Sequence, residues 1–385
     1  MDFNSQVTPM EQKESKKRGR GRVIAAGLAA LILVLCALGV LLYRDRLTPE
    51  SLRAAFGKTS PVSQDGEPFT YEVGSGQVFA VSGNRLAVAS AMGFQLLNEK
   101  GLTLAHEVLS MEQPAITASP GLCVFYDAGG TELRVADAEG TVQSLEVGGK
   151  IISARVNREN DLAVITEETG YKAVVTVYNS ALQKLFVWHS GMAYVLAAEV
   201  SPSGKYLAAV CAGTEGGSLK VFSLSAEEPL GEFTVSGELF WDLRWQDKDR
   251  VCILSDSRMV FLDEKAQQQN EYNFGGQYLL DYDPGSDFTA LLLGTHRAGN
   301  GGKLVLIGTD GREMCSRDVE KDVLSLSAGS DKLLILYGDS LELCTDALAT
   351  INSTEDTLGV KKALLRKDGK CLLLSAYGAE LAELY

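Results

Sequence analysis

A strand–turn–strand unit that recurs about every 41 residues constrains the fold of this chain more than any other feature. Its clearest copy is 195–211 (VLAAEVSPSGKYLAAVC), and its last copy is 362–376 (KALLRKDGKCLLLSA). In both copies a polar turn separates two apolar segments of strand length. Eight copies align on this turn, and their first strands begin near residues 77, 113, 151, 194, 239, 278, 322 and 361. Such a period indicates one repeat domain rather than several unrelated domains.

Each copy continues with two more strand-length segments around a second polar turn, as in 133–147 and 303–319. Four strands in roughly 40 residues, repeated in tandem, are typical of the blades of a propeller. We therefore predict an all-β fold, an eight-bladed β-propeller over residues 67–385. Seven blades are the alternative, if one of the weaker copies is an insertion.

The two ends of the repeat region predict how the ring closes. The eighth copy has only three strands and ends at Tyr385, whereas 67–73 (EPFTYEV) is an additional strand before the first copy. We expect this N-terminal strand to complete the last blade as its outer strand. The joint would hold both ends of the ring together and leave no unpaired edge there.

The repeat resembles those of WD40-like, TolB-like and quinoprotein-like β-propellers. The turn 201–205 (SPSGK) is close to the Ser-Pro-Asp-Gly-Lys turn of TolB-type repeats. The resemblance covers 67–385 and implies a fold rather than an activity. The chain departs from these families because its blades do not end on Trp-Asp and it has no quinoprotein Trp motif.

An apolar segment near the N-terminus predicts a membrane anchor. Residues 23–43 (VIAAGLAALILVLCALGVLLY) carry no charge and are long enough to cross a bilayer as a helix. The basic tail, 1–22, should stay in the cytoplasm. We expect an uncleaved signal anchor, because the segment exceeds the apolar region of a signal peptide. Residues 44–66 would form a short amphipathic helix and a linker, and 67–385 would lie outside the cell membrane.

This single-pass layout resembles that of bacterial, Gram-positive, membrane-anchored propeller proteins. The predicted outer part is strongly acidic, since residues 47–385 hold 28 Lys and Arg against 46 Asp and Glu. The whole chain has a net charge of −14. Nucleic acid is therefore excluded as a main partner, because its binding depends on neutralising phosphates with cations. With only 3 His, we expect neither a His-built metal centre nor another cofactor.

One position of the innermost strands carries alternating charges. Two residues before the turn, the third to sixth copies have Arg155, Glu199, Arg244 and Asp281, and the others have Ala80, Thr117, Ser325 and Leu364. Innermost strands line the central channel of a propeller. We therefore predict that the four charged side chains face this channel as neighbours. A structural charge network is the ordinary interpretation, and a binding site for a small polar ligand is the alternative.

Two glycine-rich loops are candidate contact surfaces. The loop 213–217 contains Thr214 and Glu215, and the loop 294–302 contains His296, Arg297 and Asn300. Both join the second and third strands of their blades, so we expect them on one face. The second loop is not a phosphate-binding loop, because no Gly-Lys-Ser/Thr opens a helix after it.

The sequence favours binding over catalysis. It contains no Gly-x-Ser-x-Gly motif, and no Cys–His pair can be placed together. The six cysteines outside the apolar segment fall in separate predicted blades, so we expect buried thiols rather than disulfides. We expect a module that binds or scaffolds an extracytoplasmic protein or envelope partner. A propeller enzyme of the lyase, lactonase or glycosidase type is the alternative.

Overall fold

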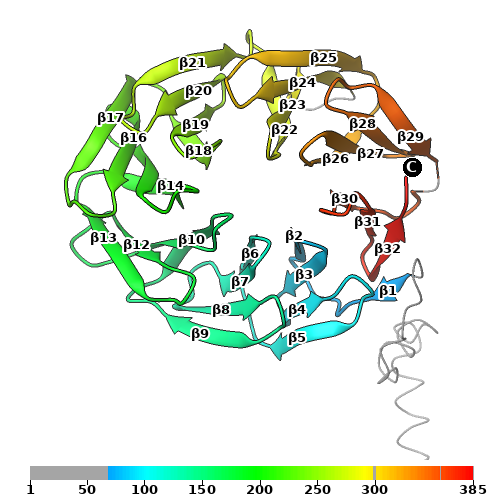
Figure 1. Cartoon of the computed structure of the whole chain (residues 1–385), viewed down its shortest axis with the longest axis horizontal. Helices are drawn as coiled ribbons and strands as arrows, with labels where there is room; N and C mark the ends of the chain where they lie inside the picture. Colours follow the sequence, from blue (N-terminus) through cyan, green and yellow to red (C-terminus); the bar gives the residue numbers. More distant parts are fainter. Residues whose placement is uncertain (1–67, 298–300, 356, 385) are drawn as a thin grey trace, which may run out of the picture. The chain divides into compact units, whose positions relative to one another are not determined.

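The computed structural model describes residues 68–297, 301–355 and 357–384. This part of the chain folds into eight four-stranded antiparallel sheets arranged as the blades of a ring (Figure 1). The predicted all-β propeller with eight blades is confirmed, and the seven-bladed alternative is wrong. The predicted membrane anchor, the juxtamembrane segment and Asn300 lie outside the described residues. Among the described residues, none belongs to a helix that could cross a membrane.

The strands follow the chain from the innermost to the outermost position of each blade. Blade 1 contains β2 (Val78–Ser82), β3 (Arg85–Ser90), β4 (Gly93–Leu97) and β5 (Thr103–Val108). Blade 2 contains β6 (Pro114–Ala118), β7 (Leu122–Asp127), β8 (Glu132–Asp137) and β9 (Val142–Glu146). Blade 3 contains β10 (Ile151–Val156), β11 (Leu162–Thr166), β12 (Ala173–Tyr178) and β13 (Lys184–Ser190). Blade 4 contains β14 (Tyr194–Val200), β15 (Tyr206–Ala212), β16 (Gly216–Ser223) and β17 (Pro229–Ser236).

The second half of the ring repeats this order. Blade 5 contains β18 (Phe240–Trp245), β19 (Arg250–Ser255), β20 (Arg258–Asp263) and β21 (Gln268–Asn273). Blade 6 contains β22 (Tyr278–Pro284), β23 (Phe288–Gly294), β24 (Gly302–Gly308) and β25 (Glu313–Val319). Blade 7 contains β26 (Val323–Ala328), β27 (Lys332–Tyr337), β28 (Leu341–Thr345) and β29 (Thr350–Thr354). Blade 8 contains β30 (Lys362–Leu365), β31 (Cys371–Leu374), β32 (Gly378–Ala382) and the N-terminal β1 (Phe69–Thr70).

The last blade joins the two ends of the ring. β1 pairs antiparallel with β32, with Phe69 opposite Ala379 and Thr70 opposite Gly378. The side chains of Phe69 and Tyr71 are buried, and the Tyr71 hydroxyl donates a 2.6 Å hydrogen bond to the Ser375 carbonyl. In Figure 1 the blue first strand accordingly lies beside the red last strand. The short strand therefore gives β32 the neighbour that an exposed edge would lack.

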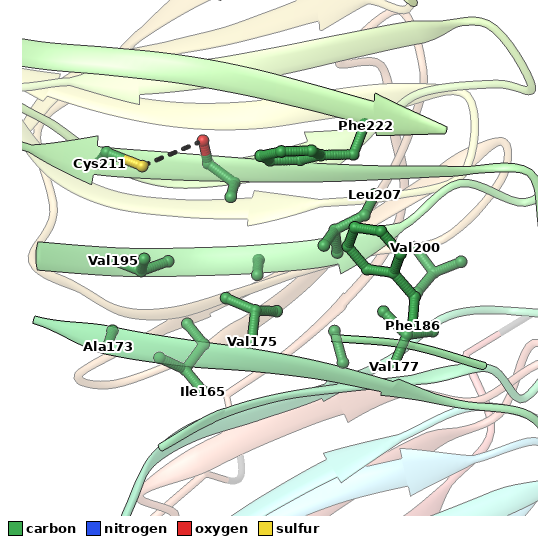
Figure 2. Packing of buried hydrophobic residues seen from close by; sticks show 13 residues of the cluster. Ile165, Ala173, Val175, Val177, Phe186, Val195, Val200, Leu207, Cys211 and Phe222 are labelled. Atoms are coloured by element: carbon green, nitrogen blue, oxygen red, sulfur yellow. Dashed lines mark hydrogen bonds between the residues drawn. The ribbon is translucent and has the colours of Figure 1, made fainter. Parts of the chain in front are cut away.

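The hydrophobic core consists of eight layers, one between each pair of neighbouring blades. Figure 2 shows the layer between blades 3 and 4, in which Val175 and Phe186 of blade 3 pack with Val195 and Phe222 of blade 4. The two middle strands of a blade are buried on both faces, which explains their continuous apolar runs. The outermost strands alternate instead, as in the pattern of half-buried and exposed residues along β17.

The connections define two faces of the ring. The turns between the first and second strands and between the third and fourth strands lie on one face, here the turn face. The loops between the second and third strands and the connections from blade to blade lie on the opposite face, here the loop face. This division follows from the antiparallel order of every blade.

Candidate functional site

The hairpin turns identify equivalent positions of the innermost strands. In blade 2 the turn begins where Ser119 N–H donates to the Leu122 carbonyl. In blades 6 and 7 the corresponding bonds run from Gly285 N–H to the Phe288 carbonyl and from Gly329 N–H to the Lys332 carbonyl. The sequence alignment placed both turns two residues too early, because polar residues inside these strands resemble turn residues.

Two of the aligned residues are therefore corrected. The position two residues before the turn is occupied by Asp283 in blade 6 and by Ser327 in blade 7, not by Asp281 and Ser325. Asp281 still lies in β22, one side-chain layer further from the turn face. Its carboxylate accepts a 2.9 Å hydrogen bond from its neighbour Tyr282 N–H, and burial raises its pKa.

At this corrected position, polar side chains link one blade to the next. Each accepts a hydrogen bond from a backbone N–H of the following innermost strand. The bonds are Thr117 Oγ1 from Val156 N (3.1 Å), Glu199 Oε2 from Trp245 N (3.2 Å), Asp283 Oδ2 from Ala328 N (2.6 Å) and Ser327 Oγ from Leu365 N (2.9 Å). An innermost strand has a free edge, so these contacts satisfy backbone donors that have no neighbouring strand.

The two arginines at this position make different contacts. Arg155 reaches past blade 4 to blade 5, where Nη2 lies 2.7 Å from Asp242 Oδ1 and Nη1 donates to the Leu243 carbonyl at 2.5 Å. Arg244 Nη1 lies 3.5 Å from Glu199 Oε1. Arg155 thus forms its direct ion pair with Asp242 rather than with Glu199, its predicted neighbour, although the Glu199 charge also acts on it. Glu199 and Arg244 lie next to each other.

Asp242 is the centre of this network. Its side chain is 8% exposed, and its second oxygen accepts a hydrogen bond from the Tyr282 hydroxyl. Burial opposes its charge, but Arg155 and Arg244 outweigh that effect and lower the pKa of Asp242. Burial and the adjacent Asp242 carboxylate raise the pKa of Tyr282, so this hydroxyl remains a hydrogen-bond donor.

Asp283 has the opposite environment. Burial raises its pKa to about 6, although the Ala328 N–H and the cations of Arg244 and Lys362 oppose the rise. The carboxyl group therefore stays partly protonated at about pH 6, well above the ordinary range of an aspartate. Sequence reasoning missed both Asp242 and Asp283, because each lies two residues from the position that the alignment singled out.

Between blades 5 and 6 both the acceptor and the donor of this link are missing, whereas blades 1, 3 and 8 lack only the acceptor, because they have Ala80, Arg155 and Leu364 at this position. Arg244 cannot accept a hydrogen bond, and the following blade has Pro284, which has no N–H, at the donor position. A cavity of about 10 Å³ lies here, lined by residues that include Asp242, Arg244, Tyr282 and Pro284. It has room for about one water molecule. Arg244 Nε has no partner among the described residues and lies beside this space.

The predicted loop residues lie on the loop face. Thr214 and Glu215 are exposed between β15 and β16, and the Glu215 carbonyl accepts a 2.9 Å hydrogen bond from Gly237 N–H. His296 and Arg297 are exposed between β23 and β24. The Arg297 guanidinium lies over the ring of Tyr278, 5.3 Å from its centroid. The first loop thus contacts the connection from blade 4 to blade 5 through Gly237, and the second contacts the start of β22 through Tyr278.

A second feature of the loop face was not predicted. Of the 18 exposed large apolar side chains in the described residues, four lie near the turn face, because each is the second residue of an outermost strand that begins there; they are Leu185, Leu230, Met314 and Ile351. The other 14 lie in loop-face connections or at the strand ends that adjoin them. The connecting turns of the opposite face contain none of the 18. Apolar exposure is thus concentrated on one side of the ring.

The thiols of the described residues are mostly buried. All six cysteines are unpaired thiols, five of them buried, as expected from their positions. Burial raises the pKa of Cys211, Cys344 and Cys371 to about 12, so these thiols stay protonated. The described ranges contain no cluster of three His, Cys, Asp or Glu that could hold a metal ion.

Comparison with known proteins gives a family and a fold. A family model described as "Family of unknown function (DUF5711)" matches residues 70–347. The chain belongs to this family. No curated protein matches its sequence. The family match begins at Thr70, the second residue of β1, and ends within blade 7, so β30, β31 and β32 lie outside it.

Several solved structures have a fold similar to that of this chain. The C-terminal WD40 domain of Sif2 is similar at 13% identity and a TM-score of 0.57, covering 82% of this chain and 98% of that one. BamB from Moraxella catarrhalis is similar at 10% identity and a TM-score of 0.52, covering 82% and 96%. The dihydro-heme d1 dehydrogenase NirN is similar at 14% identity and a TM-score of 0.52, and the match covers 74% of this chain and 66% of NirN. The predicted resemblance to WD40-like and TolB-like propellers is confirmed, and at these identities it concerns the fold alone.

Proposed function

We propose that this chain is a membrane-anchored module that binds or scaffolds a protein or envelope partner outside the cytoplasm. The observation that carries the proposal is the concentration of exposed apolar side chains on the loop face. Monomeric soluble proteins seldom expose such groups together, and large apolar patches mark interaction sites. A rigid ring whose blades are joined by buried layers presents these side chains at fixed positions.

The inner wall supports binding or scaffolding rather than catalysis. Its charged groups are engaged with one another and with the backbone, as in the pair of Arg155 with Asp242 and the contacts of Glu199. A general base or nucleophile needs a side chain that is available to a substrate. The resemblance to NirN does not favour an enzyme, because an identity of 14% carries over the fold only.

The proposed location depends on the sequence of the N-terminal part. The uncharged segment 23–43 and the basic tail 1–22 favour a single span with the tail inside. Cysteine accessibility in intact cells tests this topology. A thiol reagent that cannot cross membranes should label Ser63→Cys and should not label Ser5→Cys. The reverse pattern would refute the proposed orientation.

Site-specific photo-crosslinking in cells tests the binding role. Met192 precedes β14 on the loop face and is 88% exposed, whereas Met314 lies on an outermost strand. A photoreactive amino acid at position 192 should yield a discrete adduct of defined mass. The same amino acid at position 314 should yield none. If position 192 and the other loop-face positions give no adduct, the binding proposal fails.

A further inference from the structure

We infer that the loop-face mouth of blades 3–7 docks a cationic, apolar segment of another protein. The inference rests on the proposed function and adds the position of the surface and the chemistry of its partner. It depends on three features of the described residues: a repeated irregularity in the innermost strands, the exposure it creates and the charge around it.

The innermost strands of blades 3–7 share a bulge at one position. In β10 the residues Ile151 and Ser153 pair with consecutive residues of β11, so Ile152 is an additional residue. The additional residues of the next four blades are Leu196, Trp241, Leu280 and Leu324. The pairing of β2, β6 and β30 shows no such shift. Five consecutive blades therefore carry the same irregularity, which is the behaviour of a built feature rather than a defect.

The bulge turns an apolar side chain out of the core. The residue before it faces inward and is buried in blades 3–5, as Ile151, Val195 and Phe240 show. The additional residue is exposed in four of the five blades, at 37–47%. Leu280 is the exception, because its side chain packs over Gly294. These side chains lie at the loop-face ends of the innermost strands of blades 3, 4, 5 and 7, and we call Ile152, Leu196, Trp241 and Leu324 the bulge set.

Two tyrosines widen this surface and already bind cations. Tyr194 and Tyr278 begin β14 and β22 and are exposed beside the bulge set. Lys172 Nζ lies 4.9 Å from the centroid of the Tyr194 ring, and Arg297 lies 5.3 Å from that of Tyr278. Aromatic faces attract cations through their quadrupole. The mouth therefore combines apolar side chains with two aromatic rings, each of which already has one of the chain's own cations over it.

The charge of the surrounding connections selects the partner. The described residues of the loop-face connections that enter blades 3–7 or lie within them include eight carboxylates and four Lys or Arg. Two of these carboxylates are already paired, Asp339 with Lys321 at 3.0 Å and Glu238 with Arg258 at 2.7 Å, which leaves six carboxylates and three cations. An acidic rim around an apolar centre attracts a cationic segment and repels a second copy of the same face. It also repels an anionic bilayer surface. A cationic, apolar polypeptide is the occupant that satisfies both features.

Binding of labelled peptides to the purified full-length chain in detergent tests the inference. The probes are three twelve-residue peptides with the repeats Leu-Lys-Ser, Leu-Gln-Ser and Leu-Glu-Ser, measured by fluorescence anisotropy. The cationic peptide should bind at least about tenfold more tightly than the other two. Its affinity should fall as salt increases. Equal affinities for the three peptides would overturn the inference.

A matched pair of variants tests whether the cationic peptide binds at this surface or simply to the acidic protein as a whole. Leu196→Ser with Leu324→Ser removes side chains that are 38% and 47% exposed, and Leu185→Ser with Leu230→Ser removes two that are both 46% exposed on outermost strands. The first variant should lose about tenfold in affinity for the cationic peptide, and the second should retain it. If both variants lose affinity equally, the inference is wrong. Met192→Ser should likewise weaken binding of the cationic peptide. Met192 is 88% exposed in the connection between β13 and β14, so this substitution should leave the fold intact.

Two other outcomes would replace the proposed occupant. Self-association that increases with concentration and disappears in the Leu196→Ser, Leu324→Ser variant would assign the surface to a second copy. Binding to phosphatidylglycerol vesicles that disappears in the same variant would assign it to a bilayer. If position 192 crosslinks to a partner in cells while the peptides show no preference, the binding role stands and only the cationic chemistry fails.

Discussion

Arg155 and Asp242 lie two blades apart in the ring, yet their side chains form a 2.7 Å ion pair across the innermost strand between them. Asp242 is almost fully buried, and Arg155 is 21% exposed. The pair also holds Arg155 against the Leu243 carbonyl. It therefore joins blades 3 and 5 at the inner wall, where the strands have free edges.

Replacing the acid of this pair should destabilise the ring clearly. Asp242→Asn leaves the Arg155 charge with little solvent and without its partner, which should reduce the free energy of unfolding by about 3 kcal/mol. The control is Asp339→Asn, which breaks the exposed pair with Lys321 and should cost no more than about 1 kcal/mol. Urea denaturation measures both values. Equal losses would contradict a stabilising role for the buried pair.

The contacts between blades can be tested without changing charge or shape. Thr117→Val keeps the size of the side chain but removes the acceptor of the Val156 N–H, so it should cost about 1–3 kcal/mol. Thr117→Ser retains the hydroxyl and should stay closer to the parent. Thermal unfolding distinguishes the two variants. A serine variant that is less stable than the valine variant would show that the methyl group, not the hydrogen bond, matters.

Asp283 should make stability depend on pH between about pH 4 and 6. Its pKa is about 6 in the fold, above the ordinary 3.8, so between about pH 4 and 6 the folded chain binds more protons than the unfolded chain. Its contribution to stability therefore falls as pH rises through this range and stays low above it. Asp283→Asn keeps an acceptor for the Ala328 N–H and removes the titration.

The measurement is the difference in unfolding free energy between Asp283→Asn and the parent, followed from pH 4 to pH 7. The difference should move in favour of the variant as pH rises. Taking a difference cancels carboxylates with lowered pKa values, such as Glu342 at about 2. A difference that is constant with pH would refute the raised pKa of Asp283.

Ring closure should depend on one buried aromatic side chain. Phe69 of β1 packs in the layer between blades 8 and 1, and its ring lies against Gly101 of blade 1. Phe69→Ala should therefore cost about 3–5 kcal/mol. Thr70→Ala, at an exposed neighbour, should change stability by less than about 0.5 kcal/mol. Comparable effects of the two substitutions on the melting temperature would argue against the end-joining role.

The loop-face mouth shows how much of a site the sequence can reveal. Each bulge lies in a recognisable sequence pattern, a pair of adjacent apolar residues near the start of the innermost strand. The second residue of the pair is the additional one, as in Ile151-Ile152 and Phe240-Trp241. Strict alternation would place only one of the two inside. The pair alone does not predict a bulge, however, because two adjacent apolar residues also occur in strands buried on both faces.

The charged residues of the inner wall illustrate the opposite limit. Glu199 and Arg244 were predicted as neighbours because adjacent blades bring equivalent positions together. The partner of Arg155 could not be predicted in this way, since a long side chain can pass one blade and reach the next. The position of Asp283 was missed because a polar residue inside a strand resembles the start of a turn.

By itself the sequence determined the number of blades, the order of their strands and the strand that closes the ring, because a repeat of about 41 residues leaves few ways to bury its apolar strands. Only the tertiary structure decided which side chains meet at the inner wall and which apolar residues remain exposed on the loop face. These depend on register, and a shift of one residue exchanges the two faces of a strand. Periodicity specifies strands, whereas bulges and contacts between blades that are not adjacent require the assembled ring.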